Sequence, residues 1–507
     1  MKRNNILTRI LLLTMALLTV LSMAACNGGS EGGDTTATTT DGNQGGTTGA
    51  TDTTDTAGEP GPNIPAGLTF GGDEFKIYLR GVNGEGVDYA ADLYVGDTLN
   101  DYATAVERAV YTRMEQVAST YDVVFDVQVE DGDVLDSSVV NNSAMTGTDV
   151  YDLVVDHGVY MLGHAAKNLL MEYEQLPYVD VEKPWWNQEV NETFRTPGGK
   201  LFVMTGDISY MSVGAAFSMF FNKDIIADVQ GLDSPYEKVY ADEWTFEEFE
   251  SYVLATDSNL NGDGSGVVGQ DKFGYATGKW RGPVQMFYST DGRVLERRGD
   301  EWKFTLNSNT ANKAVVDFRD LVFQSGSAYV ELVSSYTNLQ LAFMANEVAF
   351  FDDHVNAASV FKGSGLNFGL LPWPKYNDDV GENRYCSAVD AGSSLFGVLR
   401  NTTEENAKKV SAIMESMAYL GSRDVLPFYF DTILSYQYLK DDDSIHMLQI
   451  IYENLVFDFG YFYSELRTTF MSTAANPTGG SLNQAFNTAL PGAKSSLEKW
   501  EALDDEH

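Results

Sequence analysis

The stretch that decides the fold reads EFKIYL at residues 74–79, DVVFDV at 122–127 and YDLVVD at 151–156. Short apolar or alternating runs of this kind predict β-strands. Between the first two strands, residues 103–119 place apolar side chains at helical spacing, which predicts an amphipathic helix. A strand, a helix and two further strands are typical of the start of a parallel α/β sheet.

The third of these strands is followed by the first candidate site residues. In open α/β sheets, ligands bind beyond the carboxyl ends of the strands. His157 and Tyr160 come directly after the strand at 151–156. We therefore predict that both residues face a binding site.

The rest of the chain continues to alternate between strands and helices. Residues 200–209 predict a short hairpin, and Thr245 with Glu248 predicts a helix start closed by a capping box. A well-patterned helix is expected at 404–420. The chain from Ile445 onward is expected to be mostly helical, with a Gly/Pro break at 476–480.

The N-terminus predicts export and lipidation. Lys2, Arg3 and Arg9 precede an apolar run at 10–21, which is too short for a comfortable membrane span. The run leads to SMAAC, in which Cys26 follows two alanines, as in a bacterial lipobox, with Met23 where leucine is usual. We predict a lipoprotein signal peptide at 1–25; a plain signal peptide cleaved elsewhere is the alternative.

Residues 26–66 are predicted to be the lipidated Cys26 followed by a disordered Gly/Thr/Asp tether. Residues 27–63 are almost all Gly, Thr, Asp, Ala and Ser, with no aromatic residue. Such a segment buries too little apolar surface to offset the entropy of ordering it. A domain on this tether would stay at the membrane and reorient freely.

The charge of the chain argues against two classes of partner. It carries 73 Asp and Glu against 33 Lys and Arg, a formal net charge of −40. This charge argues against binding to nucleic acid and to anionic lipid surfaces. The chain has 2 cysteines, so a lipidated Cys26 leaves Cys386 without a disulfide partner. We expect Cys386 to be buried and unreactive.

Several motifs occur in an order that carries a family resemblance. The motifs are FFNKD at 220–224, WTFEEF at 244–249, DKFGY at 271–275, FMANEVA at 343–349, NFGLLP at 367–372 and ENAKK at 405–409. With the strands from residue 74 onward, they resemble extracellular solute-binding proteins of the carbohydrate ABC-importer class, the maltose-binding-protein-like family. Each motif is weak alone, and the resemblance covers roughly residues 74–420.

The resemblance implies an α/β fold of the two-lobed periplasmic-binding-protein-like type II, with a ligand cleft between the lobes and a helical C-terminal region. The implied boundaries are 67–212 for lobe I, 213–392 for lobe II and 393–430 for a return to lobe I. Residues 431–507 would form C-terminal helices that pack mainly on lobe II. The chain would cross between the lobes near 210–217 and 387–396.

The same resemblance implies a function. The protein would bind a small solute, expected to be a mono- or oligosaccharide, by closing its lobes and would deliver it to ABC permease subunits. Peptides, polyamines and other polar solutes remain open as ligands. We expect a monomer outside the cytoplasm of a bacterium, attached to the cell membrane through its N-terminal lipid only, with no cofactor.

Further candidate ligand contacts follow from their positions in this arrangement. Trp280 and Arg281 come after a strand at 273–276, and Asp352 and His354 come after a strand at 348–351. Tyr210 and Asp390 fall at the two crossings, and they complete the predicted ligand-binding set. The alternative is that Trp280 packs under a surface loop and that 352–354 form a solvated turn.

One loop resembles the start of an EF-hand calcium loop. Asp257, Asn259, Asn261 and Asp263 alternate as oxygen ligands would, with a glycine at 262 for the turn. The twelfth position holds Val268 where such loops have Glu. A structural calcium ion is therefore one prediction, and a turn-rich loop without metal is the other.

Enzyme signatures are missing from the sequence. It holds no Gly-x-Ser-x-Gly elbow, His-Glu-x-x-His motif or phosphate-binding Gly-Lys-Ser/Thr motif, and no cysteine pair for zinc. We therefore predict a protein that is not an enzyme. The rival hypotheses are a secreted carbohydrate-active hydrolase that uses two carboxylates, and a surface-binding lipoprotein without a transport role.

Overall fold

The first sheet is built around β1 (Asp73–Leu79), whose Ile77 and Leu79 are fully buried. The computed structural model describes residues 61–505, apart from 102, 147–150, 261–265, 299–300, 334, 380–383, 435–438 and 440. Within it, β1 pairs in parallel with β2 (Val123–Val129) and β3 (Leu153–His157). The predicted parallel start of the fold is confirmed. Cys26 and most of the tether lie outside the described residues.

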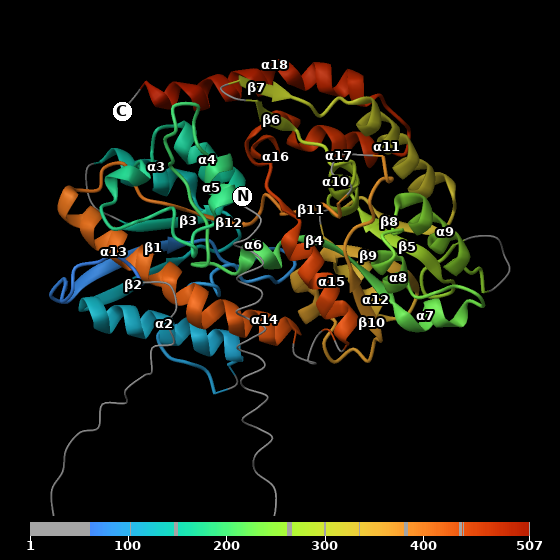
Figure 1. Cartoon of the computed structure of the whole chain (residues 1–507), viewed down its shortest axis with the longest axis horizontal. Helices are drawn as coiled ribbons and strands as arrows, with labels where there is room; N and C mark the ends of the chain where they lie inside the picture. The colour runs from blue at the N-terminus through green and yellow to red at the C-terminus, as the bar shows by residue number, and fades with distance from the viewer. Residues whose placement is uncertain are drawn as a thin grey trace, which may run out of the picture. The chain divides into compact units, whose positions relative to one another are not determined.

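A fourth strand joins this sheet from far along the chain. β12 (Ser394–Gly397) pairs antiparallel with β3, and Ser394 lies opposite His157. The strand order is β12-β3-β1-β2. The helices α2 (Ala105–Tyr121) and α13 (Glu404–Leu420) pack against one another beside it (Figure 1). We call this sheet and its helices lobe I.

The helix starts of lobe I follow their sequence signals. In α2, Thr104 accepts a hydrogen bond from the Glu107 backbone N–H, and the Glu107 carboxylate accepts one from the Thr104 N–H. This reciprocal capping box satisfies donors that a helix start leaves free. At the start of α13, the Thr403 hydroxyl accepts a hydrogen bond from the Asn406 backbone N–H, which is one half of such a capping arrangement. The helix occupies the residues predicted for it.

The second sheet is mixed and more deeply buried. Its order is β10-β4-β9-β5-β8, with β4 antiparallel to both neighbours and β9, β5 and β8 parallel. The strands are β4 (Phe217–Asn222), β5 (Phe273–Gly278), β8 (Ala328–Glu331), β9 (Val348–His354) and β10 (Phe368–Leu371). Every residue of β4, β5 and β9 is buried. We call this sheet and its helices lobe II.

The remaining helices and strands complete the two lobes and the C-terminal region. The helices are α3 (Ser137–Met145), α4 (Gly158–Ala166), α5 (Gln188–Thr193), α6 (Met211–Gly214), α7 (Lys223–Asp228), α8 (Pro235–Tyr240), α9 (Phe246–Thr256), α10 (Arg281–Tyr288), α11 (Asn309–Arg319), α12 (Thr337–Met344), α14 (Leu426–Leu434), α15 (Asp442–Glu453), α16 (Phe459–Tyr463), α17 (Thr469–Ala474) and α18 (Leu482–Glu501). The short strands are β6 (Leu295–Arg298), β7 (Glu301–Phe304), β11 (Ser387–Ala388) and β13 (Leu455–Val456).

Three segments pass between the lobes side by side. Ala216 pairs with Val389, and the Asp390 backbone N–H donates to the Ala215 carbonyl at 3.0 Å. β11 pairs in parallel with β13, and the Val389 N–H donates to the Val456 carbonyl at 3.0 Å. The two crossings implied at 210–217 and 387–396 are thus paired with each other. The third crossing, at β13, was not indicated by any pattern in the sequence.

The hairpin predicted at 200–209 is wrong. This segment instead makes single bridges to distant chain: Met204 pairs with Phe396, and Gly206 pairs with Trp186. A side chain at Gly206 would clash with the Trp185 carbonyl, which shows how closely the backbones approach. The apolar residues of 201–204 are fully buried by these tertiary contacts, and a local hairpin would not bury them this well.

The C-terminal helix α18 packs on both lobes. Leu482, Phe486 and Ala493 belong to the lobe II core, whereas Trp500 lies in the lobe I core. The helix has 20 residues, a length of about 30 Å, and its course is visible along one edge of Figure 1. Beyond it, Asp504 accepts hydrogen bonds from the Thr196 hydroxyl and, at 2.7 Å, from the Gly198 N–H.

The other C-terminal helices also divide between the lobes. α15 packs on β10 of lobe II, and α17 packs on α10 and α11. α16 packs on α4 of lobe I. The lobe boundaries drawn from the sequence stay predictions, because the C-terminal region has contacts on both sides.

Removing the lobe I anchor of α18 should destabilise the protein. Trp500 is fully buried and its ring lies 5.1 Å from that of Phe459. We expect Trp500→Ala to lower the free energy of unfolding by about 3–5 kcal/mol, because it leaves a cavity at the end of a bridging helix. Urea unfolding measures this change. The neighbouring exposed Lys499→Ala is the control, and equal effects of the two substitutions would contradict the packing described.

Candidate functional site

Arg281 lies at the centre of the candidate site. It begins α10, directly beyond the carboxyl end of β5, and its side chain is 8% exposed. Its Nη2 lies 2.5 Å from Glu85 Oε2 and its Nη1 lies 2.8 Å from Asp353 Oδ1. Its Cζ stands 3.7 Å from the centre of the Tyr336 ring. The charge of this buried guanidinium is thereby paired with two carboxylates, and its plane lies on an aromatic face.

Glu85 belongs to the other lobe. It lies on the loop that follows β1, so its contact with Arg281 joins lobe I to lobe II. Its second carboxylate oxygen accepts a hydrogen bond from the Tyr336 backbone N–H at 3.1 Å. Burial lowers the pKa of Arg281, but Asp353 and Glu85 outweigh it and raise that pKa above its ordinary value. Arg281 is therefore charged at every physiological pH.

The carboxyl end of β9 supplies the next three polar groups. Asp352, Asp353 and His354 are part of β9, so the prediction that the strand ends at Phe351 and is followed by these residues is wrong by three residues. The strand continues because β4 pairs with it as far as Phe217 opposite His354. Asp353 also accepts from Gln340 Nε2 at 2.9 Å.

Asp352 and Asp390 have opposite electrostatic environments. Asp352 Oδ1 accepts from the Tyr275 hydroxyl at 2.7 Å, and burial raises the pKa of Asp352 to about 6. Burial would also raise the pKa of Asp390, but the hydrogen bond and charge of His354 hold it well below its usual range. His354 Nε2 lies 3.3 Å from Asp390 Oδ2. Asp390 is thus ionised at neutral pH and places a negative charge between the lobes.

His157 reaches the same region from lobe I. It caps α4, where its Nδ1 accepts from the Val159 N–H at 3.3 Å. Burial first, and then the charge of Arg80, lower the pKa of His157 to about 4, so the imidazole is neutral at pH 7. Asp390 and His157 lie close enough for each to influence the other's pKa. Tyr160 is 46% exposed, and its ring packs edge-on against that of His157, with 5.5 Å between the ring centres.

Tyr210 lies apart from this group. Its ring stacks on Tyr429 of α14 at 4.4 Å, and burial, followed by the charge of Asp92, raises its pKa well above the ordinary value. The structure therefore brings together His157, Arg281, Asp352, His354 and Asp390, and it places Tyr210 against the helices beside the crossing.

A pocket of about 370 Å³ opens beside Trp280. Trp280 and Lys279 line it, with the Lys279 Nζ 4.8 Å from the indole centre. The other lining residues are Leu332, Thr468, Met471, Ser472 and Ala475. An aromatic face with a few hydroxyl and ammonium groups suits a small polar molecule that has apolar C–H faces.

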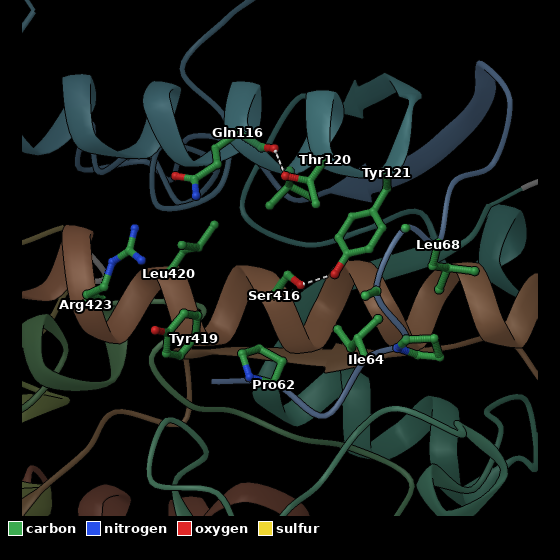
Figure 2. Close-up of a pocket in the computed structure, with 14 residues that line it drawn as sticks. Pro62, Ile64, Leu68, Gln116, Thr120, Tyr121, Ser416, Tyr419, Leu420 and Arg423 are labelled. Atoms are coloured by element: carbon green, nitrogen blue, oxygen red, sulfur yellow. Dashed lines mark hydrogen bonds between the residues drawn. The ribbon is translucent and has the colours of Figure 1, made fainter. Parts of the chain in front are cut away.

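A second pocket, of about 300 Å³, lies on the outer side of lobe I and holds none of the predicted site residues (Figure 2). Pro62, Ile64 and Leu68 lie against α2 and α13, near a hydrogen bond of 2.6 Å between Tyr121 and Ser416. Pro62 and Ile64 belong to the last part of the tether predicted at 26–66, and they pack here against lobe I, so the prediction of disorder is wrong for these residues. The pocket lies away from the polar groups described above.

Sequence reasoning missed Glu85, Tyr336 and Arg467. Glu85 lies between two glycines just beyond the carboxyl end of β1, a position that could have marked it. Arg467 is half-buried on η5 (Glu465–Thr468) and forms no ion pair among the residues that the structure describes. Its charge acts on His157 and on Tyr461. No local pattern indicated either Tyr336 or Arg467.

The predicted calcium loop is described only in part. Asn261 and Asp263 lie outside the described residues. Asp257 ends α9, and burial raises its pKa. Asp271 accepts the N–H groups of Leu260 and Val267, each at 2.9 Å, and so closes the loop. Among the residues that are described, no group of acidic, His or Cys side chains is arranged to hold a metal.

Comparison with solved structures identifies the fold. No family model matches the sequence, and no curated protein matches it either. The galacto-N-biose-/lacto-N-biose I-binding protein of an ABC transporter from Bifidobacterium longum superposes with a TM-score of 0.57 at 12% identity, covering 85% of this chain and 98% of its own. The chain has the fold of ABC-transporter solute-binding proteins.

Two further structures extend this likeness. UgpB from Mycobacterium tuberculosis, in complex with glycerophosphocholine, gives a TM-score of 0.55 at 14% identity over 85% of this chain and 99% of its own. The GacH receptor of Streptomyces glaucescens superposes with a TM-score of 0.52 at 14% identity, covering 86% of this chain and 99% of its own. The predicted two-lobed type II fold is confirmed. At these identities the likeness concerns the fold, and ligand contact by individual residues stays a prediction.

Asp352 should make stability depend on pH. Its folded pKa of about 6 lies above the ordinary value of an aspartate carboxyl, so the fold favours the protonated carboxyl. Its contribution is therefore full below about pH 4 and is lost as pH rises to 6, by roughly 2–3 kcal/mol. Asp352→Asn keeps an acceptor for Tyr275 and cannot ionise. We expect the variant to lose this part of the pH dependence and to be at least as stable as wild type at pH 7.5.

Chemical denaturation at several pH values between 4 and 8 measures the difference. A variant that is less stable than wild type at pH 7.5, with an unchanged slope, would show that Asp352 is ionised and needed in that form.

Proposed function

We propose that the protein is the extracytoplasmic solute-binding component of an ABC importer, with a mono- or oligosaccharide bound between its lobes. The observation that carries the proposal is the polar group formed by both lobes around Arg281, next to the pocket beside Trp280. Carboxylates and Arg467 would bind sugar hydroxyls, and the indole would stack on C–H faces.

The fold suits this role because solute binding and closure are coupled. When the lobes close around a solute, water leaves both surfaces, and the closed protein differs in shape from the open one. A permease that binds the closed form is then loaded only with solute present. The solved neighbours named above were determined in complex with lacto-N-biose, acarbose and glycerophosphocholine, all of which are rich in polar groups.

The proposal extends to the N-terminus and to the partners. Residues 1–25 would direct export, Cys26 would carry the lipid, and the tether would leave the monomeric domain free to reach the permease at a bacterial cell membrane. Among the described residues, no helix has the length and hydrophobicity to cross a membrane. A structural calcium at Asp257, Asn259, Asn261 and Asp263 also remains a proposal.

Two other functions lead to different measurements. A carbohydrate-active hydrolase would release reducing ends from polysaccharides. A surface lipoprotein without a transport role would show no stabilisation by small solutes, because ligand that binds the native state raises its stability.

The lipid anchor has its own test. We expect the wild-type chain expressed in a bacterial host to incorporate labelled fatty acid and to sediment with membranes. Cys26→Ser should abolish both, because the thiol is the acylation site. A Cys26→Ser chain that still takes up fatty acid would contradict the assignment of Cys26.

Ligand binding is tested by calorimetry against a panel of mono- and oligosaccharides, with polyamines and peptides included. We expect at least one sugar to bind. Trp280→Ala should then weaken that binding by about tenfold, since stacking on an aromatic ring contributes on the order of 0.5–1.5 kcal/mol. Val333→Ala, an exposed residue outside the pocket lining, is the control. A protein that binds none of these solutes would overturn the proposal.

A further inference from the structure

One ion pair joins the two lobes at the candidate site. Glu85 of lobe I gives both carboxylate oxygens to lobe II: one to Arg281 Nη2 at 2.5 Å and the other to the Tyr336 N–H at 3.1 Å. The side chains of Glu85 and Arg281 are 13% and 8% exposed. A carboxylate that accepts from both a guanidinium and a backbone N–H makes a strong, directional contact.

The lobe II half of this contact is held without Glu85. Asp353 Oδ1 lies 2.8 Å from Arg281 Nη1, and the Arg281 backbone N–H donates to the Tyr336 hydroxyl at 2.9 Å. The guanidinium also stacks on the Tyr336 ring. If the lobes separate, Arg281 therefore keeps one carboxylate and its aromatic partner, and only Glu85 returns to water.

The lobe I half is also pre-arranged. Asn83 Oδ1 accepts the N–H groups of Glu85 and Val87, each at 2.9 Å, and the Asn83 N–H donates to the Val87 carbonyl at 3.0 Å. Gly86 has φ +83°, a backbone conformation that glycine adopts without strain. A turn fixed by its own hydrogen bonds loses little entropy when Glu85 docks.

We infer that Glu85 is a positioning residue that holds the two lobes closed through Arg281 and Tyr336, and so sets how readily the proposed binding site closes around a solute. Because both halves are formed in advance, docking of Glu85 requires no rearrangement within either lobe. A contact of this kind favours the closed arrangement even without solute. The solute can then complete closure with a smaller difference between its affinities for the closed and open arrangements. Only the statement about closure around a solute rests on the proposed function.

Hydrogen exchange of the full ligand-free chain tests the inference directly. In Glu85→Gln the Tyr336 amide loses a charged acceptor, and we expect its peptide to exchange about tenfold faster than in wild type. Peptides from the β9 core should be unchanged. Glu174→Gln, which removes the same charge from an exposed site in lobe I, is the matched control and should behave as wild type.

Small-angle scattering of the unlipidated Cys26→Ser chain supplies the second readout. We expect Glu85→Gln to increase the radius of gyration, with an unchanged midpoint of urea unfolding. Two outcomes overturn the inference. Glu85→Gln could match the control in both measurements, or it could lower the unfolding midpoint and speed exchange throughout lobe I, as a purely structural residue would. Neither readout uses a solute, so failure to find a ligand leaves this test intact.

Discussion

The charge of Arg281 has to be matched by carboxylates, because an arginine buried at this depth is stable only when it is paired. Lobe II supplies Asp353 and the face of Tyr336, and lobe I supplies Glu85. The position of Arg281 beyond β5 and that of Asp353 at the end of β9 follow from the parallel pairing of those two strands. The rest of the candidate site is arranged around this requirement.

The two sheets can meet at this point because the chain passes between them in paired segments. The bridge between Ala216 and Val389 and the hydrogen bonds of β11 with β13 hold three crossings together. Asp390, which follows one crossing, is thereby placed next to His354 of lobe II and near His157 of lobe I. At the C-terminal end, α18 adds a further connection, with its core contacts divided between the lobes.

Features with local causes could be predicted from the sequence. The strand at 74–79 and the helix at 404–420 were predictable because apolar periodicity and cap residues lie within the segments themselves. The position of His157 followed from the rule that ligands bind beyond the carboxyl ends of strands, and those of Arg281 and Asp390 followed from the family resemblance. By contrast, the pairing of Glu85 with Arg281 spans 196 residues and leaves no local signal. The hairpin expected at 200–209 failed for the same reason, because partners far along the chain, such as Phe396, bury its apolar residues.

The central claim is that a solute binds between the lobes, in contact with groups from both. A crystal structure of the protein grown with the tightest-binding sugar tests it most directly. The account predicts electron density for the sugar beside Trp280 and the carboxyl end of β9, with contacts to lobe I as well. Density on an outer surface of one lobe, such as the groove between α2 and α13, with the interlobe region filled only by water, would contradict it.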